Sequence, residues 1–189
     1  MYKRQPQGGV CSAKIWIIAF DYALDIINTD LTEGQGFADD LCILTQGTDV
    51  NVMQQRMQTV LNQLVAKSRE ANLTFSPEKT VAGHDVLTKK RKILTRLYIE
   101  GKKLNTVETT RYLGVTIDNT LSWTPHINHK IDQCSSLLRT ITRKTSSYFG
   151  PKPKLMRWVY TGIIRPKFTF GALVWTHNIS PKQHKNLTN

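Results

Sequence analysis

Two adjacent carboxylates, Asp39 and Asp40, are the residues of this sequence best suited to chemistry. They lie between Phe37 and the apolar run 41–44, a pattern that predicts two short strands flanking a tight turn. Carboxylates of this kind bind Mg²⁺ together with substrate phosphates, and two such ions can clamp the attacking and leaving oxygens in phosphoryl transfer. Taken alone, the pair fits an ordinary turn better, because Asp readily hydrogen-bonds its own backbone.

Helices are expected on both sides of this turn. Apolar residues recur at helical spacing over residues 12–28, with Ser12 as the natural N-cap. The Thr48-Asp49 pair caps a second predicted helix, whose apolar stripe continues for about four turns. A short strand is expected at residues 73–75, closed by a Ser-Pro pair.

The remaining elements predict a change of character along the chain. They are strands at 97–99, 103–104 and 112–117, then a helix from Thr124 and Pro125 to Ile141 and another at 154–164. A boundary near residues 119–124 separates a mixed region (residues 1–120) from a helical region (residues 121–189). The predicted fold class is α+β, an antiparallel sheet with packed helices followed by a mainly helical region.

Charge is distributed unevenly between the two halves of the chain. Residues 1–84 hold 7 Lys/Arg against 9 Asp/Glu, whereas residues 85–189 hold 19 against 5, and the total is +12. Such an excess favours a polyanionic partner, which charge alone leaves open between nucleic acid and an anionic membrane. Aromatic residues among the basic ones favour nucleic acid. They are Trp123, Tyr148, Phe149, Trp158, Tyr160 and Phe168.

The cysteine pattern indicates a reducing compartment. Cys11, Cys42 and Cys134 are odd in number and far apart, which is typical of reduced, mostly buried thiols. A zinc site at His126, His129 and Cys134 lacks a fourth ligand and is disfavoured. With no apolar window long enough to span a bilayer and no signal peptide, we expect an intracellular protein (nuclear, cytoplasmic or both) that is not secreted and does not bind membranes.

Several motifs together resemble the reverse transcriptases of non-long-terminal-repeat (LINE-like, jockey-type) retrotransposons. The matching stretches, in chain order, are 6–10 (Pro-Gln-Gly-Gly-Val), 37–40 (Phe-Ala-Asp-Asp), 73–80 (Leu-Thr-Phe-Ser-Pro-Glu-Lys-Thr), 112–115 (Tyr-Leu-Gly-Val) and 170–175 (Phe-Gly-Ala-Leu-Val-Trp). Each motif alone is weak, but their order and spacing agree over essentially the whole chain. The resemblance implies a truncated palm at residues 1–120 followed by a basic thumb at residues 121–189.

The resemblance also implies roles for particular residues. Asp39 is expected to bind the catalytic Mg²⁺ or Mn²⁺ directly, with Asp40 beside it, and Lys79 to neutralise or protonate the leaving pyrophosphate. The incoming dNTP and the template are expected at Gln7, Gly8, Gly9, Phe37 and Ala38, although Phe37 is expected to pack mainly in the palm core.

Further residues are implied for the bound RNA template and DNA primer. Tyr112, Leu113 and Gly114 resemble the primer grip. In the basic thumb, Lys130, Arg139, Arg143 and Lys144 are expected to follow the phosphates of the duplex. Phosphate contacts fix position but carry no sequence information, so shape-based, salt-sensitive binding is expected.

Two departures from the family pattern bear on activity. The family has another catalytic Asp before the Pro-Gln-Gly segment, and only five residues precede Pro6 here. We therefore expect these 189 residues alone not to copy RNA into DNA. Ala13 and Lys14 also depart from the expected start of the following helix. The alternative is a non-catalytic nucleic-acid-binding remnant of a retroelement, and an unrelated basic interaction domain is a third, less favoured interpretation.

Overall fold

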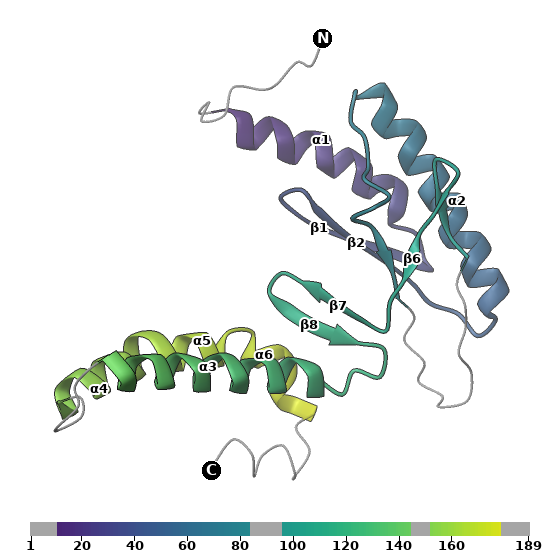
Figure 1. The fold of residues 1–189 in the computed structure, drawn as a ribbon. Coiled ribbons are helices and arrows are strands. Elements are labelled where there is room, and N and C mark those ends of the chain that lie inside the picture. The colour runs from purple at the N-terminus through teal and green to yellow at the C-terminus, as the bar shows by residue number, and fades with distance from the viewer. Residues whose placement is uncertain (1–10, 84–95, 145–151, 179–189) are drawn as a thin grey trace. The chain divides into compact units, whose positions relative to one another are not determined.

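The computed structural model describes residues 11–83, 96–144 and 152–178 of the chain (Figure 1). The chain forms two compact units. Unit 1 contains Met1–Ala82 and Lys92–Thr106, and unit 2 contains Gly83–Arg91 and Val107–Asn189. The predicted Pro-Gln-Gly segment, with Gln7, Gly8 and Gly9, lies outside the described residues.

Unit 1 is built from two helices and an antiparallel hairpin. These are α1 (Ser12–Ile27), α2 (Val50–Glu70), β1 (Thr32–Phe37) and β2 (Asp40–Thr45). Two pairs of short strands complete it. They are β3 (Val81–Ala82) parallel to β6 (Asn105–Thr106), and β4 (Tyr98–Ile99) antiparallel to β5 (Lys102–Lys103). The predicted mixture of helices and strands is therefore confirmed, but the strands of the described residues form separate two-stranded sheets, one of them parallel, instead of the one antiparallel sheet that was expected.

Two glycines allow α1 to pack closely against β1. A Cβ at Gly34 would lie 2.7 Å from Ile27 Cγ2, and one at Gly36 would overlap the ring of Phe20. The side chain of Asn28 also accepts a hydrogen bond from the Gly34 N–H at 2.7 Å. Because side chains alternate along a strand, this same face carries the buried Thr32.

The core of unit 1 lies between the helices and this face of the hairpin. The buried residues Ile27, Val60 and Leu64 contact half-buried Leu41 and Ile43 of β2. A second cluster joins α2 to the short strands, and its members are Leu61, Ala82, Leu97, Ile99 and Leu104. Asp49 caps α2 as predicted, by accepting a hydrogen bond from the Asn51 N–H at 2.8 Å.

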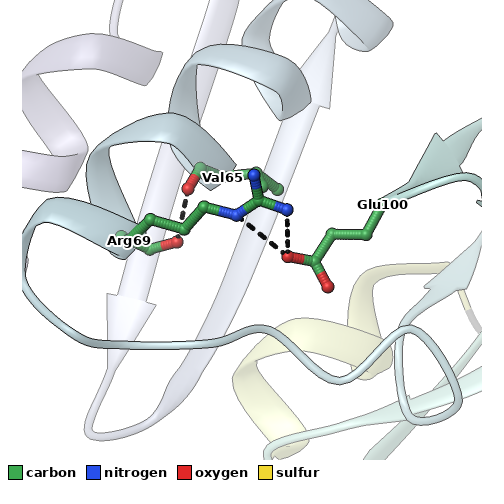
Figure 2. Close-up of polar contacts among 4 residues, drawn as sticks. Val65, Arg69 and Glu100 are labelled. Carbon is green, nitrogen blue, oxygen red and sulfur yellow. Dashed lines mark hydrogen bonds and ion pairs between the residues drawn. The ribbon is translucent and has the colours of Figure 1, made fainter.

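An ion pair joins the end of α2 to the β4–β5 turn (Figure 2). The Arg69 guanidinium donates to Glu100 Oε1 from Nε at 3.2 Å and from Nη2 at 2.8 Å. Glu100 and Gly101 have φ angles of 52° and 77°, as a tight hairpin turn requires. The predicted turn at Gly101 is therefore confirmed.

Unit 2 combines a hairpin with a helical array. Strands β7 (Thr109–Tyr112) and β8 (Val115–Asp118) are antiparallel, and Leu113 and Gly114 form their turn. The helices are α3 (Thr124–Lys144), α4 (Pro153–Val159), the π-helix η1 (Tyr160–Ile164), α5 (Arg165–Thr169), α6 (Ala172–Trp175) and the 3₁₀ helix η2 (Thr176–Asn178). One core cluster centres on Trp123, Ile127 and Trp175, and another on Cys134, Val159 and Ile164.

The carboxylate of Asp118 organises the connection from β8 to α3. Its Oδ2 accepts hydrogen bonds from the hydroxyls of Thr120 and Ser122, and its Oδ1 accepts from the Trp123 N–H at 3.0 Å. Asp118 is buried, and burial acts to raise its pKa. The hydrogen bonds from Thr120, Ser122 and Trp123 outweigh that effect and lower the pKa of Asp118 below its ordinary value.

Some sequence predictions were wrong in detail. Cys11 rather than Ser12 occupies the N-cap of α1, and residues 73–75 do not form a strand. The expected single strand at 112–117 is interrupted by the turn at Leu113 and Gly114, since both have positive φ. The helix expected at 154–164 continues to Thr169, because the π-helix accommodates the chain without ending it.

The grouping of residues into two units differs from the predicted boundary. The hairpin β7–β8 belongs to unit 2 with the helices, although it lies within the predicted mixed region, residues 1–120.

Within the three described segments, no helix is both long and apolar enough to span a bilayer. Of the cysteines, Cys134 is buried as expected, Cys42 is half-buried, and Cys11 is exposed, contrary to expectation.

We predict that Asp118→Asn destabilises unit 2 at neutral pH by about 2 kcal/mol, because it removes a charged acceptor from several hydrogen bonds. Since the folded pKa is lowered, the stabilisation is present above about pH 4, the ordinary carboxyl range, and is lost as pH falls through the folded pKa. Urea unfolding at several pH values measures both effects. Asp132→Asn, on α3, is the control, because Asp132 accepts none of the hydrogen bonds that hold this connection. Equal loss in both variants would contradict the prediction.

Candidate functional site

The Asp39-Asp40 pair lies at the end of the β1–β2 hairpin. Phe37 pairs with Asp40, so Ala38 and Asp39 form a two-residue turn. Ala38 has a φ of 53°, which fits a hairpin turn but costs an alanine about 1 kcal/mol. Both Asp39 and Asp40 are exposed, and within the described segments neither carboxylate has a hydrogen bond or ion pair. The predicted acidic turn between two strands is therefore confirmed.

One face of the hairpin is open. Side-chain alternation places Asp40 with Phe37 on the face opposite the glycines that contact α1. Phe37 is 63% exposed, and Leu44 is 58% exposed. The expectation that Phe37 packs in a core was therefore wrong for this structure, because the helices cover only the other face.

An aromatic pair from α1 supports the acidic turn. The Trp16 indole N–H donates a hydrogen bond to the Ala38 carbonyl at 2.6 Å. Trp16 also stacks on Phe20, with ring centroids 6.0 Å apart and an interplanar angle of 28°. The sequence analysis did not assign either residue to the site. Their spacing of one helical turn was the available signal, but it did not show that the indole N–H faces the turn.

Lys79 lies in a separate turn of unit 1. Its backbone N–H donates to the Ser76 carbonyl at 3.2 Å, and its side chain is exposed. No contact between Lys79 and either Asp39 or Asp40 is present in the described structure. A role for Lys79 at the leaving pyrophosphate therefore remains a prediction.

The donor set for a metal ion at the hairpin is incomplete by itself. Two adjacent, exposed carboxylates fit the way Mg²⁺ takes one or two protein carboxylates together with phosphate oxygens. Among the residues whose placement is described, no group of three or more His, Cys, Asp or Glu side chains is placed to hold a metal. Asp39 and Asp40 therefore need further oxygen ligands from a substrate or from other residues.

The predicted primer-grip residues form the tip of the β7–β8 hairpin in unit 2. Leu113 and Gly114 have φ angles of 46° and 85°. A Cβ at Gly114 would lie 2.9 Å from Phe170 Cε1, so the positive φ and the close aromatic contact both favour glycine. Tyr112 is half-buried beside this turn. Residues 112–115 therefore form a hairpin turn where a strand was expected, and their contact with a primer remains a prediction.

A buried histidine joins this hairpin to α3. The Nδ1 of His126 accepts a hydrogen bond from the Thr116 N–H at 3.1 Å. Burial chiefly lowers the pKa of His126, and the positive charges of Lys130, His129 and Arg111 lower it further. The ring is therefore neutral with its proton on Nε2, and it packs against Trp175 at 5.8 Å. A role in the hairpin–helix junction explains His126 without a metal.

Lys130 differs from its predicted position. Only 8% of the residue is exposed, and its Nζ lies 5.1 Å from the centroid of the Phe170 ring. Burial chiefly lowers its pKa, and Arg111 and Lys167 lower it further as like charges. Lys130 was predicted as a direct phosphate contact, but its burial leaves it little surface to offer. The sequence analysis did not single out its neighbours Arg111 and Lys167.

The other predicted phosphate contacts lie on the surface of α3. Arg139, Arg143 and Lys144 are all exposed. No Asp or Glu follows Asp132 in the sequence, whereas ten Lys or Arg do. An open groove of about 450 Å³ beside α3 is lined by His129, Asp132, Ser136 and Lys167, among others. The later part of unit 2 therefore carries an unbalanced positive charge.

The aromatic residues expected to contact nucleic acid divide into two groups. Trp158 is 66% exposed and Tyr160 is 56% exposed, so both offer a ring to solvent. Trp123 is buried in the core and Phe168 is half-buried against the same cluster, which also holds Trp175. Tyr148 and Phe149 lie outside the described residues. Among these aromatic residues in the described part of the chain, Trp158 and Tyr160 are therefore the ones exposed enough to stack on a base.

Comparison with known proteins gives one consistent result. The family described as Reverse transcriptase (RNA-dependent DNA polymerase) matches residues 1–117. The putative 115 kDa protein in the type-1 retrotransposable element R1DM of Drosophila melanogaster is 25% identical over 170 residues. The probable RNA-directed DNA polymerase from transposon BS of the same species is 25% identical over 154 residues. The RNA-directed DNA polymerase from the mobile element jockey of that species is 23% identical over 190 residues.

These alignments cover the chain well and the relatives only in part. They span 90%, 79% and 96% of this chain but 16%, 16% and 20% of the respective relatives. The chain thus spans about one sixth of the length of the first two relatives. No solved structure matches the chain. The predicted resemblance to jockey-type retrotransposon enzymes is confirmed by these relatives.

We predict that Lys130→Met leaves the stability of unit 2 unchanged or raises it by roughly 1 kcal/mol at pH 7. A buried cation whose pKa is lowered costs stability in its charged form, and an apolar side chain of similar length avoids that cost. Urea unfolding followed by tryptophan fluorescence measures the change. Lys144→Met, at an exposed position, is the control and should have little effect. A loss above about 2 kcal/mol in Lys130→Met would show that its contact with Phe170 outweighs its desolvation.

Proposed function

Because the chain belongs to the reverse transcriptase (RNA-dependent DNA polymerase) family, we propose that it serves RNA-directed DNA synthesis by a retrotransposable element. In this proposal the β1–β2 hairpin presents Asp39 and Asp40 to Mg²⁺ or Mn²⁺. The metal supplies charge stabilisation of phosphate oxygens during nucleotidyl transfer. The substrates are an RNA template, a DNA primer and a dNTP.

The acidic hairpin is the observation that carries this proposal. A carboxylate with no protein partner in an exposed turn costs little and contributes little to the fold. Within the described segments Asp39 and Asp40 are such groups, and they lie in the region that matches the family. Their position at the hairpin end keeps them close in space and accessible to a cation with its bound phosphates.

The subdomain names follow from the family and belong to the proposal. We assign the mixed region, residues 1–120, to a palm and the basic helical region, residues 121–189, to a thumb. The acidic hairpin of unit 1 and the exposed basic residues of α3 support this division, while β7–β8 belongs by its contacts to the helical unit. In the palm, Gln7, Gly8, Gly9 and Ala38 line the nucleotide and template site, with Phe37 offering its exposed ring.

Nucleic acid binding is assigned to unit 2. Tyr112, Leu113 and Gly114 contact the primer through their hairpin. Arg139, Arg143 and Lys144 contact duplex phosphates, and Arg111 and Lys167 replace the buried Lys130 in that role. Lys130 contributes a nearby positive charge rather than a direct contact. Lys79 of unit 1 acts on the leaving pyrophosphate as a fixed cation.

A second function is favoured by one observation. Arg139, Arg143 and Lys144 are exposed on α3, a surface that would serve a nucleic-acid-binding remnant without catalysis as well as a polymerase. Such a protein needs its basic surface but not its acidic hairpin. The two functions therefore differ in what the loss of Asp39 does to metal binding.

We predict that the chain binds Mn²⁺ and that Asp39→Asn weakens this binding at least about tenfold, because it removes the direct ligand. Asp40→Asn weakens it less. The signal of free Mn²⁺ in electron paramagnetic resonance measures the affinity. Asp30→Asn is the matched control, since Asp30 is also exposed in unit 1. If Asp39→Asn and Asp30→Asn have the same affinity as the unsubstituted chain, the binding-only function is favoured.

We predict that the triple variant Arg139→Gln, Arg143→Gln, Lys144→Gln binds an RNA–DNA duplex more weakly and with a smaller salt dependence. Each lost phosphate contact lowers the slope of log affinity against log salt by roughly 0.9 for duplex DNA. Fluorescence anisotropy at several salt concentrations measures the slope. The control removes three charges from unit 1 (Arg56→Gln, Lys102→Gln, Lys103→Gln). Equal slopes in the two triple variants would argue against a specific role for α3.

A further inference from the structure

We propose that Trp16 is a positioning residue for the metal-binding carboxylates, acting through its hydrogen bond to the turn that carries them. The inference rests on the proposed function of Asp39 and Asp40 as metal ligands. Trp16 itself does not touch the metal. It fixes the backbone from which the Asp39 carboxylate projects.

The geometry of the bond is direct. The Trp16 indole N–H reaches the Ala38 carbonyl at 2.6 Å. In the described segments, this is the one side-chain hydrogen bond made to residues 37–40. The Ala38 carbonyl belongs to the peptide that joins Ala38 to Asp39, so a rotation of this peptide changes the direction of the Asp39 side chain. The indole therefore restrains the element that aims the carboxylate.

The turn has a reason to need this restraint. Ala38 adopts a φ of 53°, a left-handed conformation that a residue with a Cβ disfavours. Both flanking positions, Phe37 and Asp39, are exposed, so neither is buried in a core that would hold the turn. Without an external contact, the turn would sample other conformations and the two carboxylates would lose their mutual arrangement. Functional groups need to be held to within about half an ångström to act together.

Trp16 is itself held in place by contacts with the strand that ends at the turn. It stacks on Phe20, one helical turn further along α1. Phe20 lies against Gly36, where any Cβ would overlap its ring. Gly36 is two residues before Ala38, so the contacts Gly36–Phe20, Phe20–Trp16 and Trp16–Ala38 form a closed set. The position of the indole is thereby tied to the strand whose end it restrains.

The sharpest test removes only the hydrogen-bond donor. Benzothienylalanine in place of Trp16 keeps the shape of the ring and replaces the N–H with sulfur. We expect its Mn²⁺ affinity, measured by electron paramagnetic resonance on the full chain, to fall about threefold to tenfold, which matches the loss of one hydrogen bond of ordinary net strength. The Mn²⁺ affinity of Trp16→Phe should fall by at least as much. Both variants should keep the circular dichroism spectrum of the unsubstituted chain.

A destabilised control separates positioning from general loss of folding. Leu104→Val lies in the second core cluster of unit 1, away from the contact between α1 and β1, and leaves the Trp16–Ala38 bond intact. We expect it to lower the thermal midpoint of unfolding without changing the Mn²⁺ affinity. A merely structural role for Trp16 predicts that both substitutions change affinity in proportion to stability.

The outcomes distinguish the inference from the function on which it rests. If Asp39→Asn abolishes Mn²⁺ binding and both Trp16 variants bind as tightly as the unsubstituted chain, the positioning role is overturned and the metal site stands. If the unsubstituted chain binds no Mn²⁺, or binds it independently of Asp39, the metal site and the inference are both overturned. A selective loss in the Trp16 variants, absent from Leu104→Val, supports the inference.

Discussion

The close contact between helix α1 and strand β1 is the constraint on which the acidic hairpin depends. It requires hydrogen rather than a side chain at Gly34 and Gly36, because Ile27 and Phe20 occupy the space where a Cβ would lie. Close packing then orders one face of the hairpin and leaves the other face to solvent. An isolated two-stranded hairpin is marginal in water, so the helix is what makes a fixed display of two carboxylates possible.

Unit 2 contains two buried charged residues, Asp118 and Lys130, in different electrostatic surroundings. Its buried carboxylate, Asp118, is satisfied by hydrogen bonds within a short connection and so stabilises the start of α3. Its buried cation, Lys130, has Arg111 and Lys167 as neighbours of like charge. Burying a charge without an opposite partner is costly. The Asp118 carboxylate thus stabilises the fold, whereas the buried Lys130 costs stability, and a polyanion bound as proposed would lower that cost.

Sequence patterns predicted the elements that rest on local rules and failed where tertiary contacts decide. The cap at Asp49 and the turn at Gly101 follow local rules, because few residue types suit an N-cap or a turn position with positive φ. The positive φ of Leu113 could not be read from its type, so one strand was predicted where a hairpin forms. The acidic turn was predictable from Asp39 and Asp40. The hydrogen bond from Trp16 that supports this turn was not, because the spacing of Trp16 and Phe20 indicates a helix but not the direction of an indole N–H. The prediction that Lys130 contacts phosphate was wrong for the same reason, because its side chain lies on a face of α3 that Phe170, from a later segment, covers.

Two sets of exposed charge, the carboxylates of Asp39 and Asp40 and the cations of α3, support the proposed function. Exposed charges without a protein partner cost little and contribute little to folding. Within the described segments the carboxylates of Asp39 and Asp40 form no ion pair, and the exposed cations of α3 are followed by no acidic residue in the sequence. In the proposed function, divalent cations would match the carboxylates of unit 1, and the phosphates of a nucleic acid would match the exposed cations of unit 2.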